Sequence, residues 1–162
     1  MAFDAFLKID GIPGESPDSK HSGEIQLLSF SFGADQPASS STGGGAGTGK
    51  VNMHDLSILH SVDKASPKLL VACATGQHIA SAVLTSRKAG GDQQDYLIVT
   101  LSDVIVSSVQ ASGQANGSDG LPSEQVSLNF SKINFEYKEQ GSDGSLKGTV
   151  AGGFDVKTMK KV

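Results

Sequence analysis

The stretch Gln125–Glu139 reads QVSLNFSKINFEYKE, and its apolar residues change phase partway along. The first half has them at even positions and the second half at odd positions, namely Val126, Leu128 and Phe130, then Ile133, Phe135 and Tyr137. Successive residues of a strand point to opposite faces, so a run of one parity indicates a strand with one buried face. The change near Ser131 and Lys132 therefore predicts a bulge or sharp bend, which would help a sheet to curl closed.

Most of the remaining chain also reads as strands separated by turn residues. Apolar runs bounded by Gly, Pro, Ser, Asn and Asp predict strands over residues 2–9, 24–32, 51–59, 79–88, 96–109 and 149–158. With the opening stretch, this makes about seven strands. Long strands at hairpin-like spacing favour a mainly β fold, either an antiparallel barrel or a sandwich.

One short helix is expected, over residues 67–75. Ser66 is a suitable N-cap, Pro67 suits the first helical position, and Gly76 can end the helix. The apolar residues at helical spacing are Leu69, Leu70, Cys73 and Ala74. Cys73 therefore reads as a packing residue, because a reactive thiol needs a helix N-terminus or a cationic neighbour.

The second predicted strand is apolar on both faces. Ile25 and Leu27 point one way, and Leu28, Phe30 and Phe32 point the other. A strand with one face in the core needs another cover for its second apolar face. A partner subunit is the simplest cover.

Composition and charge argue against several classes of protein. The 162 residues are enough for one domain to bury a core without disulfides. A formal charge of −4 offers no basic surface to nucleic acid or an anionic membrane. The single cysteine and the acidic N-terminus, which lacks a long apolar run, indicate folding in a reducing cytoplasm without a signal peptide. We expect neither nucleic-acid binding nor membrane insertion, and any export would depend on another machine.

Residues 34–49 form a low-complexity segment rich in Ser, Gly, Ala and Thr, which predicts a long flexible loop. Its end, GGAGTGK at 44–50, matches part of a phosphate-binding loop. The match fails at Val51, where a hydroxyl residue is needed, and no strand precedes it and no helix follows it. We therefore expect no nucleotide and no other cofactor.

Metal and catalytic sites are not expected either. His54 and His60 are six residues apart and would share a strand face, but no Cys or carboxylate stands beside them at ligand spacing. His21 and His78 fall in or beside loops and read as surface residues. The serines lack a nucleophile-elbow motif and the acidic residues show no facing pair, so the sequence predicts a protein that is not an enzyme.

Several stretches in order resemble the haemolysin-coregulated protein (Hcp) family of bacterial type VI secretion. They are AFDAFLKIDGIPGES, HSGEIQLLSFSFG, KVNMHDLSI, DKASPKLLVACATGQHI, LTSRKAGGDQQDYLIVTLSDVIVSSV and SEQVSLNFSKINFEY. They cover most of the chain from Ala2 to Tyr137, and the run from Arg87 to Leu101 is the most specific. The resemblance implies one antiparallel β-barrel domain with a flanking helix.

The resemblance also implies a role and partners. Members of the family form hexameric rings that stack into the inner tube of a contractile apparatus, with a VgrG-type spike protein at the tip, a sheath around the tube and effectors as cargo. The chain would then be a homohexamer that is secreted through the apparatus and acts as a carrier or chaperone of effectors. The chain ends soon after its last predicted strand, so we expect no added toxin domain.

The flexible loop is the candidate site for ring stacking. Its expected residues are Ser39, Ser40, Ser41, Thr42, Gly43, Gly44, Gly45 and Gly47. The alternative from another class is a lectin-like β-domain that binds a ligand through its Gly/Ser loops.

Overall fold

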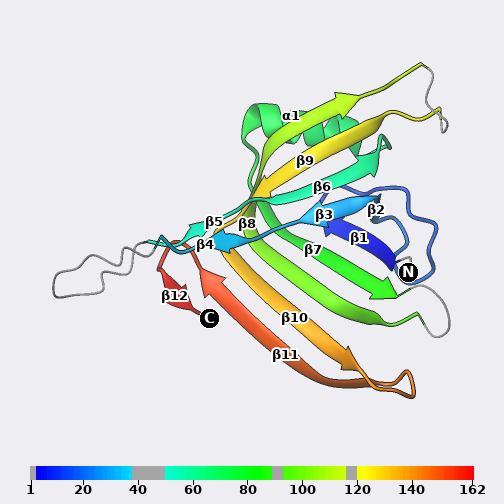
Figure 1. The fold of residues 1–162 in the computed structure, drawn as a ribbon. Coiled ribbons are helices and arrows are strands. Elements are labelled where there is room, and N and C mark those ends of the chain that lie inside the picture. Colours follow the sequence, from blue (N-terminus) through cyan, green and yellow to red (C-terminus); the bar gives the residue numbers. More distant parts are fainter. Residues whose placement is uncertain (1–2, 38–49, 89–92, 116–119) are drawn as a thin grey trace.

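The computed structural model describes residues 3–37, 50–88, 93–115 and 120–162, and within these it shows twelve strands and one helix (Figure 1). The first six strands are β1 (Phe3–Ile9), β2 (Ile25–Leu27), β3 (Ser29–Ser31), β4 (Ala34–Asp35), β5 (Asn52–Met53) and β6 (Leu56–Ser61). After helix α1 (Ser66–Thr75) come β7 (Ile79–Lys88), β8 (Asp95–Ser112), β9 (Ser123–Asn129), β10 (Lys132–Gln140), β11 (Leu146–Asp155) and β12 (Lys160–Lys161). The described fold is mainly β with one short helix, as the sequence predicts.

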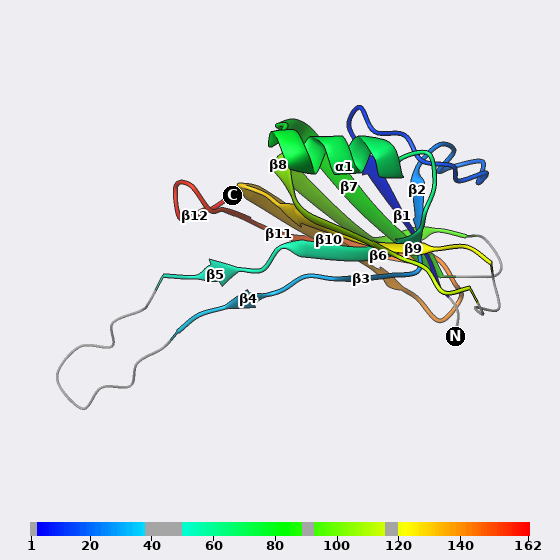
Figure 2. The same cartoon turned by 90° about the horizontal axis from the view of Figure 1, so that it is seen from above.

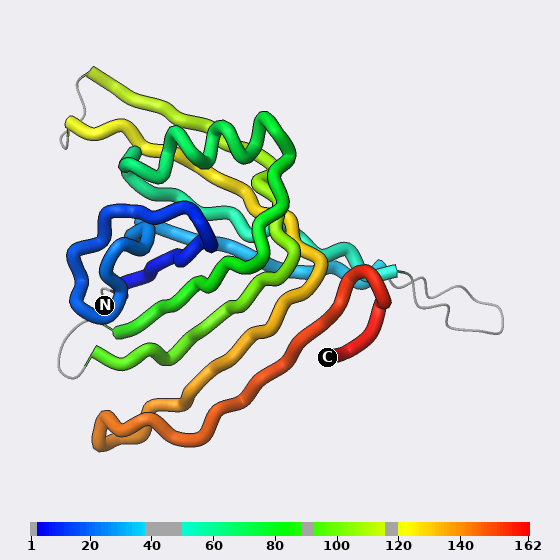
Figure 3. Tube along the Cα trace, turned by 180° about the vertical axis from the view of Figure 1, so that it is seen from behind, coloured from blue at the N-terminus to red at the C-terminus, as the bar shows by residue number. Residues whose placement is uncertain are grey.

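All strand pairs are antiparallel, and the pairings return to their starting strand. β1 pairs with β7, β7 with β8, β8 with β9, β9 with β6, and β6 with β3. β2 pairs with β1 and is separated from β3 only by Leu28, whose N–H donates to the carbonyl of Leu59 at 2.7 Å. The circuit therefore closes through the bent segment β2–β3. β10, β11 and β12 continue the sheet outward from the first half of β8 (Figure 3).

Two bends next to each other let β8 leave one sheet and join another. The first half of β8 pairs with β7 and β10, and the second half pairs with β9. Between them Asp103 has φ +52°, which permits a local change of face. Opposite it, β9 ends at Asn129 and β10 begins at Lys132, which confirms the predicted phase change. Ser131 joins the two bends, since its hydroxyl donates to the Asp103 carboxylate at 3.0 Å.

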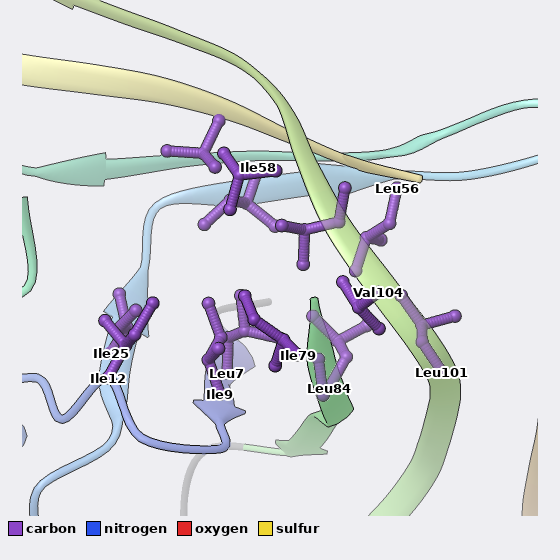
Figure 4. Packing of buried hydrophobic residues seen from close by; sticks show 14 of the residues in the cluster. Leu7, Ile9, Ile12, Ile25, Leu56, Ile58, Ile79, Leu84, Leu101 and Val104 are labelled. Atoms are coloured by element: carbon purple, nitrogen blue, oxygen red, sulfur yellow. The ribbon is translucent and has the colours of Figure 1, made fainter. Parts of the chain in front are cut away.

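Alternate residues of the circuit meet in one hydrophobic core (Figure 4). Leu7 from β1, Ile25 from β2, Leu56 from β6 and Leu84 from β7 are all fully buried, and Leu101 and Val104 bring both halves of β8 into the same core. Burying a side chain of this size contributes about 1.5–3 kcal/mol. The core therefore holds the circuit together from strands that are far apart in the sequence.

The helix begins one residue before the predicted start, and Ser66 is not its N-cap. The cap position is Ala65, and Ser66 instead accepts a hydrogen bond from the N–H of Asp63 at 3.1 Å. Gly76 ends the helix at φ +66°, as predicted. Of the expected apolar face, Leu69 is buried, whereas Leu70 is 59% exposed and Ala74 is exposed. The partly buried Cys73 packs against the core.

The predicted loop 34–49 starts too early, because Ala34 and Asp35 form β4 and pair with β5. Figure 2 shows that this short ladder extends away from the body of the molecule. The predicted seven strands become twelve because three of them, 24–32, 51–59 and 125–139, are each divided into two, and because the two-residue strands β4 and β12 were not predicted. In the part of the chain that the structure covers, no helix is long and apolar enough to cross a membrane.

Candidate functional site

A row of aromatic rings lies at the edge of the core, where three of them, Phe30, Phe32 and Phe135, pack against it. Phe3 of β1 meets Phe30 of β3 edge to face with ring centroids 6.1 Å apart. Phe30 stacks with Phe32 at 6.4 Å, and Phe32 meets Phe135 of β10 at 5.3 Å. Aromatic pairs at these distances are attractive beyond the area they bury. The row fastens the β3–β4 segment across β10.

An apolar groove of about 310 Å³ lies at the end of this row. It is lined by Phe32, Gly33, Ala34, Met53, Ile133, Phe135, Gly152, Gly153 and Phe154. Gly152 is opposite Phe135 in the ladder, and a side chain there would meet open space. At Gly153 a side chain would be crowded, since a Cβ there would lie 3.0 Å from Val162 and 3.1 Å from the Ile133 carbonyl oxygen. Gly152 thus leaves the groove open, and Gly153 lets the C-terminal turn close on β11.

The groove continues as an exposed apolar strip along β10 and β11. Cross-strand pairing puts Tyr137 opposite Val150 and on the same face as Phe135 and Phe154. Val150 is 71% exposed and Tyr137 is 41% exposed. We call this surface the apolar face of β10–β11, formed by Phe135, Tyr137, Val150, Gly152 and Phe154, of which Phe135 and Phe154 are half-buried. An exposed apolar surface is typical of a protein–protein contact.

A second surface is polar but uncharged. On β3, β6 and β9, the residues that point away from the core side chains are Ser29, Ser31, Ser57, Leu59, Ser61, Ser123, Gln125, Ser127 and Asn129. Ladder pairing places four serines in one line across four strands, Ser31, Ser57, Ser127 and Ser108. The nearest acid is Asp55, which accepts hydrogen bonds from Ser107 and Asn129. We call this surface the hydroxyl face.

A third feature is a buried cluster of charged groups that the sequence did not predict. Arg87 of β7 is 3% exposed, lies over the Phe6 ring at 4.9 Å and donates to both carboxylate oxygens of Asp18. The pKa of Asp18 is lowered to about 2, chiefly because Arg87 donates to its carboxylate. His21 is in the same cluster and only 7% exposed, so its prediction as a surface residue was wrong.

The other histidines differ from one another. His60 is fully buried on β6 and its Nε2 lies 2.8 Å from the Glu124 carboxylate on β9. His54 precedes β6 and is exposed, and its Nε2 lies 2.6 Å from Asp35. The prediction that His54 and His60 share a strand face was therefore wrong. Within the described ranges, no group of His, Cys, Asp and Glu could hold a metal ion.

The predicted ring-stacking residues, Ser39 to Gly47, lie outside the residues that the structure describes, as does most of the GGAGTGK match. The apolar face of β10–β11 was also missed, although Phe135 and Tyr137 were recognised as a buried parity. Their exposure depends on which distant parts of the chain pack over β10, and a local sequence pattern does not predict this. The charged cluster was missed because Asp18 and Arg87 are 69 residues apart in the chain.

The fold and these surfaces define a class of protein, a structural β-subunit with an uncovered apolar face. Comparison with known proteins then identifies the family. The family described as type VI secretion system effector, Hcp, matches residues 6–137, so the chain belongs to the Hcp family of type VI secretion. The resemblance noted in the sequence is thereby confirmed, and with it a non-enzymatic role as a tube protein that is secreted by the type VI system.

Individual relatives agree over nearly the whole chain. Protein hcp1 of Pseudomonas aeruginosa PAO1 is 47% identical over 149 residues, which are 91% of each chain. A solved structure described as a type six secretion system protein superposes with a TM-score of 0.94 at 34% identity, covering 99% of this chain and 100% of the other. Hcp1 from Salmonella typhimurium gives a TM-score of 0.81 at 40% identity, with both chains fully covered.

Proposed function

We propose that six copies of the chain close into a ring through the apolar face of β10–β11, and that these rings stack into the tube of the secretion apparatus. The observation that carries this proposal is the exposed strip of Tyr137 and Val150 beside the groove. A ring of identical subunits uses two different surfaces of each copy, one of which receives the other. The apolar face supplies one of the two and loses its exposure to water when it is covered.

Light scattering coupled to size-exclusion chromatography tests the ring directly. The molar mass of a hexamer, measured by light scattering, should be six times the 16.6 kDa of one chain. Val150→Glu puts a charge on the apolar face, and because Val150 is 71% exposed, the subunit should still fold. Thr149→Glu is the matched control, since Thr149 is exposed on the opposite face of the same strand. The proposal expects rings with Thr149→Glu and folded smaller species with Val150→Glu; rings in both variants would contradict it.

Stacking is proposed to involve the loop that contains Ser39 to Gly47. Its support is the β4–β5 ladder, which carries both ends of the loop away from the body of the subunit (Figure 2). Deleting residues 39–47 should leave rings intact and reduce the formation of tubes and the secretion of the protein. Electron microscopy of the deletion variant and measurement of secreted protein separate the two effects. Unchanged secretion would rule out a stacking role.

The carrier role is proposed for the hydroxyl face. A surface of Ser, Gln and Asn side chains offers hydrogen bonds to cargo of either charge, whereas a charged wall would repel half of them. Ser57→Lys and Ser127→Lys each place a cation on this face without entering the core. They should preserve rings and lower the amount of co-purifying basic effector.

The VgrG-type spike and the sheath are proposed as further partners, at the tip of the tube and around it. Assembly is proposed to start from cytoplasmic protein.

A further inference from the structure

The side chain of His21 is held between two carboxylates, one on each ring nitrogen. Nδ1 lies 2.7 Å from a Glu24 oxygen, and Nε2 lies 3.0 Å from an Asp95 oxygen. The imidazole also stacks on Phe6 with ring centroids 4.5 Å apart and planes 9° from parallel. Both ring nitrogens therefore lie within hydrogen-bonding distance of an acid, and the ring is stacked on a buried aromatic side chain.

This arrangement requires a proton. A neutral imidazole has one N–H donor and one lone pair, so it can donate to only one of the two carboxylates. Its second nitrogen would then face an anionic oxygen at hydrogen-bonding distance. Only the imidazolium donates to both acids. The geometry thus favours the cationic form.

We propose that His21 is a proton-dependent clamp that fastens the segment of residues 11–24 to the end of the β7–β8 hairpin. Asp95 begins β8, Glu24 directly precedes β2, and His21 lies in the segment between β1 and β2. Figures 1 and 3 show this segment beside the ends of β7 and β8, near the N-terminus. The clamp belongs to each subunit, so it does not depend on whether rings form.

The charges around the clamp make a neutral His21 unfavourable. From the segment and its flanks come Asp18 and Glu24, from β1 comes Asp4, and from β8 comes Asp95. The cations that face them are Arg87, which pairs with Asp18 and approaches Asp4 at 3.6 Å, and the exposed Lys20, which reaches the Gln93 carbonyl. Four carboxylates against two permanent cations leave an excess of negative charge that the His21 proton reduces.

The clamp is one of several contacts that hold this segment. Arg87 of β7 pairs with Asp18, and the Lys64 N–H donates to Glu15 at 3.0 Å. The backbone bonds within the segment are Gly14 N–H to Gly23 O at 2.8 Å, Ser16 N–H to Glu24 O at 2.9 Å, Gly23 N–H to Ser16 O at 2.9 Å and Glu24 N–H to His21 O at 3.2 Å. Asp18 accepts from the N–H groups of Lys20 and His21. When the ion pairs of His21 weaken, these amides are the ones that gain access to solvent.

The pH range follows from the same contacts. Burial lowers the pKa of His21, but the hydrogen bonds to Asp95 and Glu24 and the charges of these acids outweigh it, so the net shift is upward from 6.5. A group whose pKa is higher in the folded state stabilises it fully below the unfolded value and ceases to do so as the pH rises through the folded value. The contribution of His21 is therefore fully present below pH 6.5 and is lost as the pH rises through the folded pKa, which lies above 6.5.

Two mass-spectrometric measurements on the purified, fully assembled protein test the clamp. Exchange at the imidazole C2 position gives the pKa of His21 in the folded protein and in the same protein unfolded in urea. Amide exchange of peptides covering residues 11–24, corrected for intrinsic rates, gives the protection of the segment between pH 6 and pH 9. Peptides from β10 serve as the internal control. The variants are His21→Gln, Glu24→Gln and Asp95→Asn.

The proposal expects the folded pKa of His21 to exceed the unfolded one, and protection of 11–24 to fall by up to tenfold per pH unit above it, as one proton allows. Asp95→Asn and Glu24→Gln should each lower the folded pKa and flatten the pH dependence, and His21→Gln should abolish it. If His21→Gln does not fold, the two acid variants decide the question. A folded pKa at or below the unfolded one, or equal slopes in wild type and Asp95→Asn, would overturn the proposal.

Discussion

The buried pair of His60 and Glu124 gives the sharpest prediction about stability. The two residues stand directly opposite each other on β6 and β9, with His60 fully buried and Glu124 only 3% exposed. The other ring nitrogen, Nδ1, has no hydrogen-bond partner among the residues that the structure describes and lies 3.8 Å from Asp63. Glu124→Ala therefore leaves an imidazole in the core without any hydrogen bond.

Removing one member of a buried polar pair costs about 3 kcal/mol, because the remaining group keeps its desolvation penalty. With a urea m-value of about 2 kcal/mol/M, the midpoint of unfolding should fall by roughly 1.5 M in Glu124→Ala. Glu124→Gln keeps an acceptor oxygen and most of the volume, so it should lose only about 1 kcal/mol. Gln125→Ala, the next residue on the exposed face, should stay within about 0.5 kcal/mol of wild type.

Urea unfolding followed by circular dichroism, at one protein concentration for all variants, measures these differences. The concentration must be equal because assembly stabilises the folded chain by mass action. If Glu124→Ala and Gln125→Ala lose the same small amount of stability, the pair does not hold β6 to β9 as we describe.

Three further predictions concern the helix, the charged cluster and the segment before β2. Gly76→Ala should cost about 1 kcal/mol in thermal unfolding because Gly76 has φ +66°, whereas Gly148→Ala, on an exposed strand with open space around it, should be nearly neutral. Asp18→Asn should be less stable than wild type at pH 7. This difference in stability should shrink as the pH falls from about 4 to about 2, since the folded pKa of Asp18 is about 2. Equal differences at pH 7 and pH 3 in urea titrations would contradict this. Gly14→Ala should raise amide exchange across residues 11–24, because its Cβ would lie 2.6 Å from the Glu24 carbonyl oxygen. Gly11→Ala is the control for backbone strain, since Gly11 has φ +80° but open space for a Cβ.

Local patterns predicted those parts of the fold that depend on neighbours in the chain. The parity change at Ser131, the helix with Pro67 in its first turn and Gly76 at its end, and the main strands all follow from periodicity and turn chemistry. The bend at Asp103 also coincides with a change in the parity of the buried residues. Val99 and Leu101 have odd parity, and the core residues after the bend, Val104 and Val106, have even parity.

The contacts that join distant residues could not be predicted in this way. His21 looked like a loop residue because its partner Asp95 comes 74 positions later. Ser66 looked like an N-cap because its sequence context fits one, but its hydroxyl accepts from Asp63 in the preceding turn. A side chain whose partner lies elsewhere in the chain gives no periodic signal, so polar clusters appear only when the strands are placed side by side.

The uncovered surface follows from how the fold divides its strands. The circuit of β1, β7, β8, β9, β6 and β2–β3 closes on itself and fills its interior with its own side chains. β10 and β11 lie outside this circuit, attached along the first half of β8, and among the described residues the aromatic row and the β11–β12 turn lie over part of them. The circuit has its own core, so we propose that a neighbouring subunit covers the exposed part of β10–β11. Since the circuit is complete in each subunit, a substitution such as Val150→Glu should separate assembly from folding.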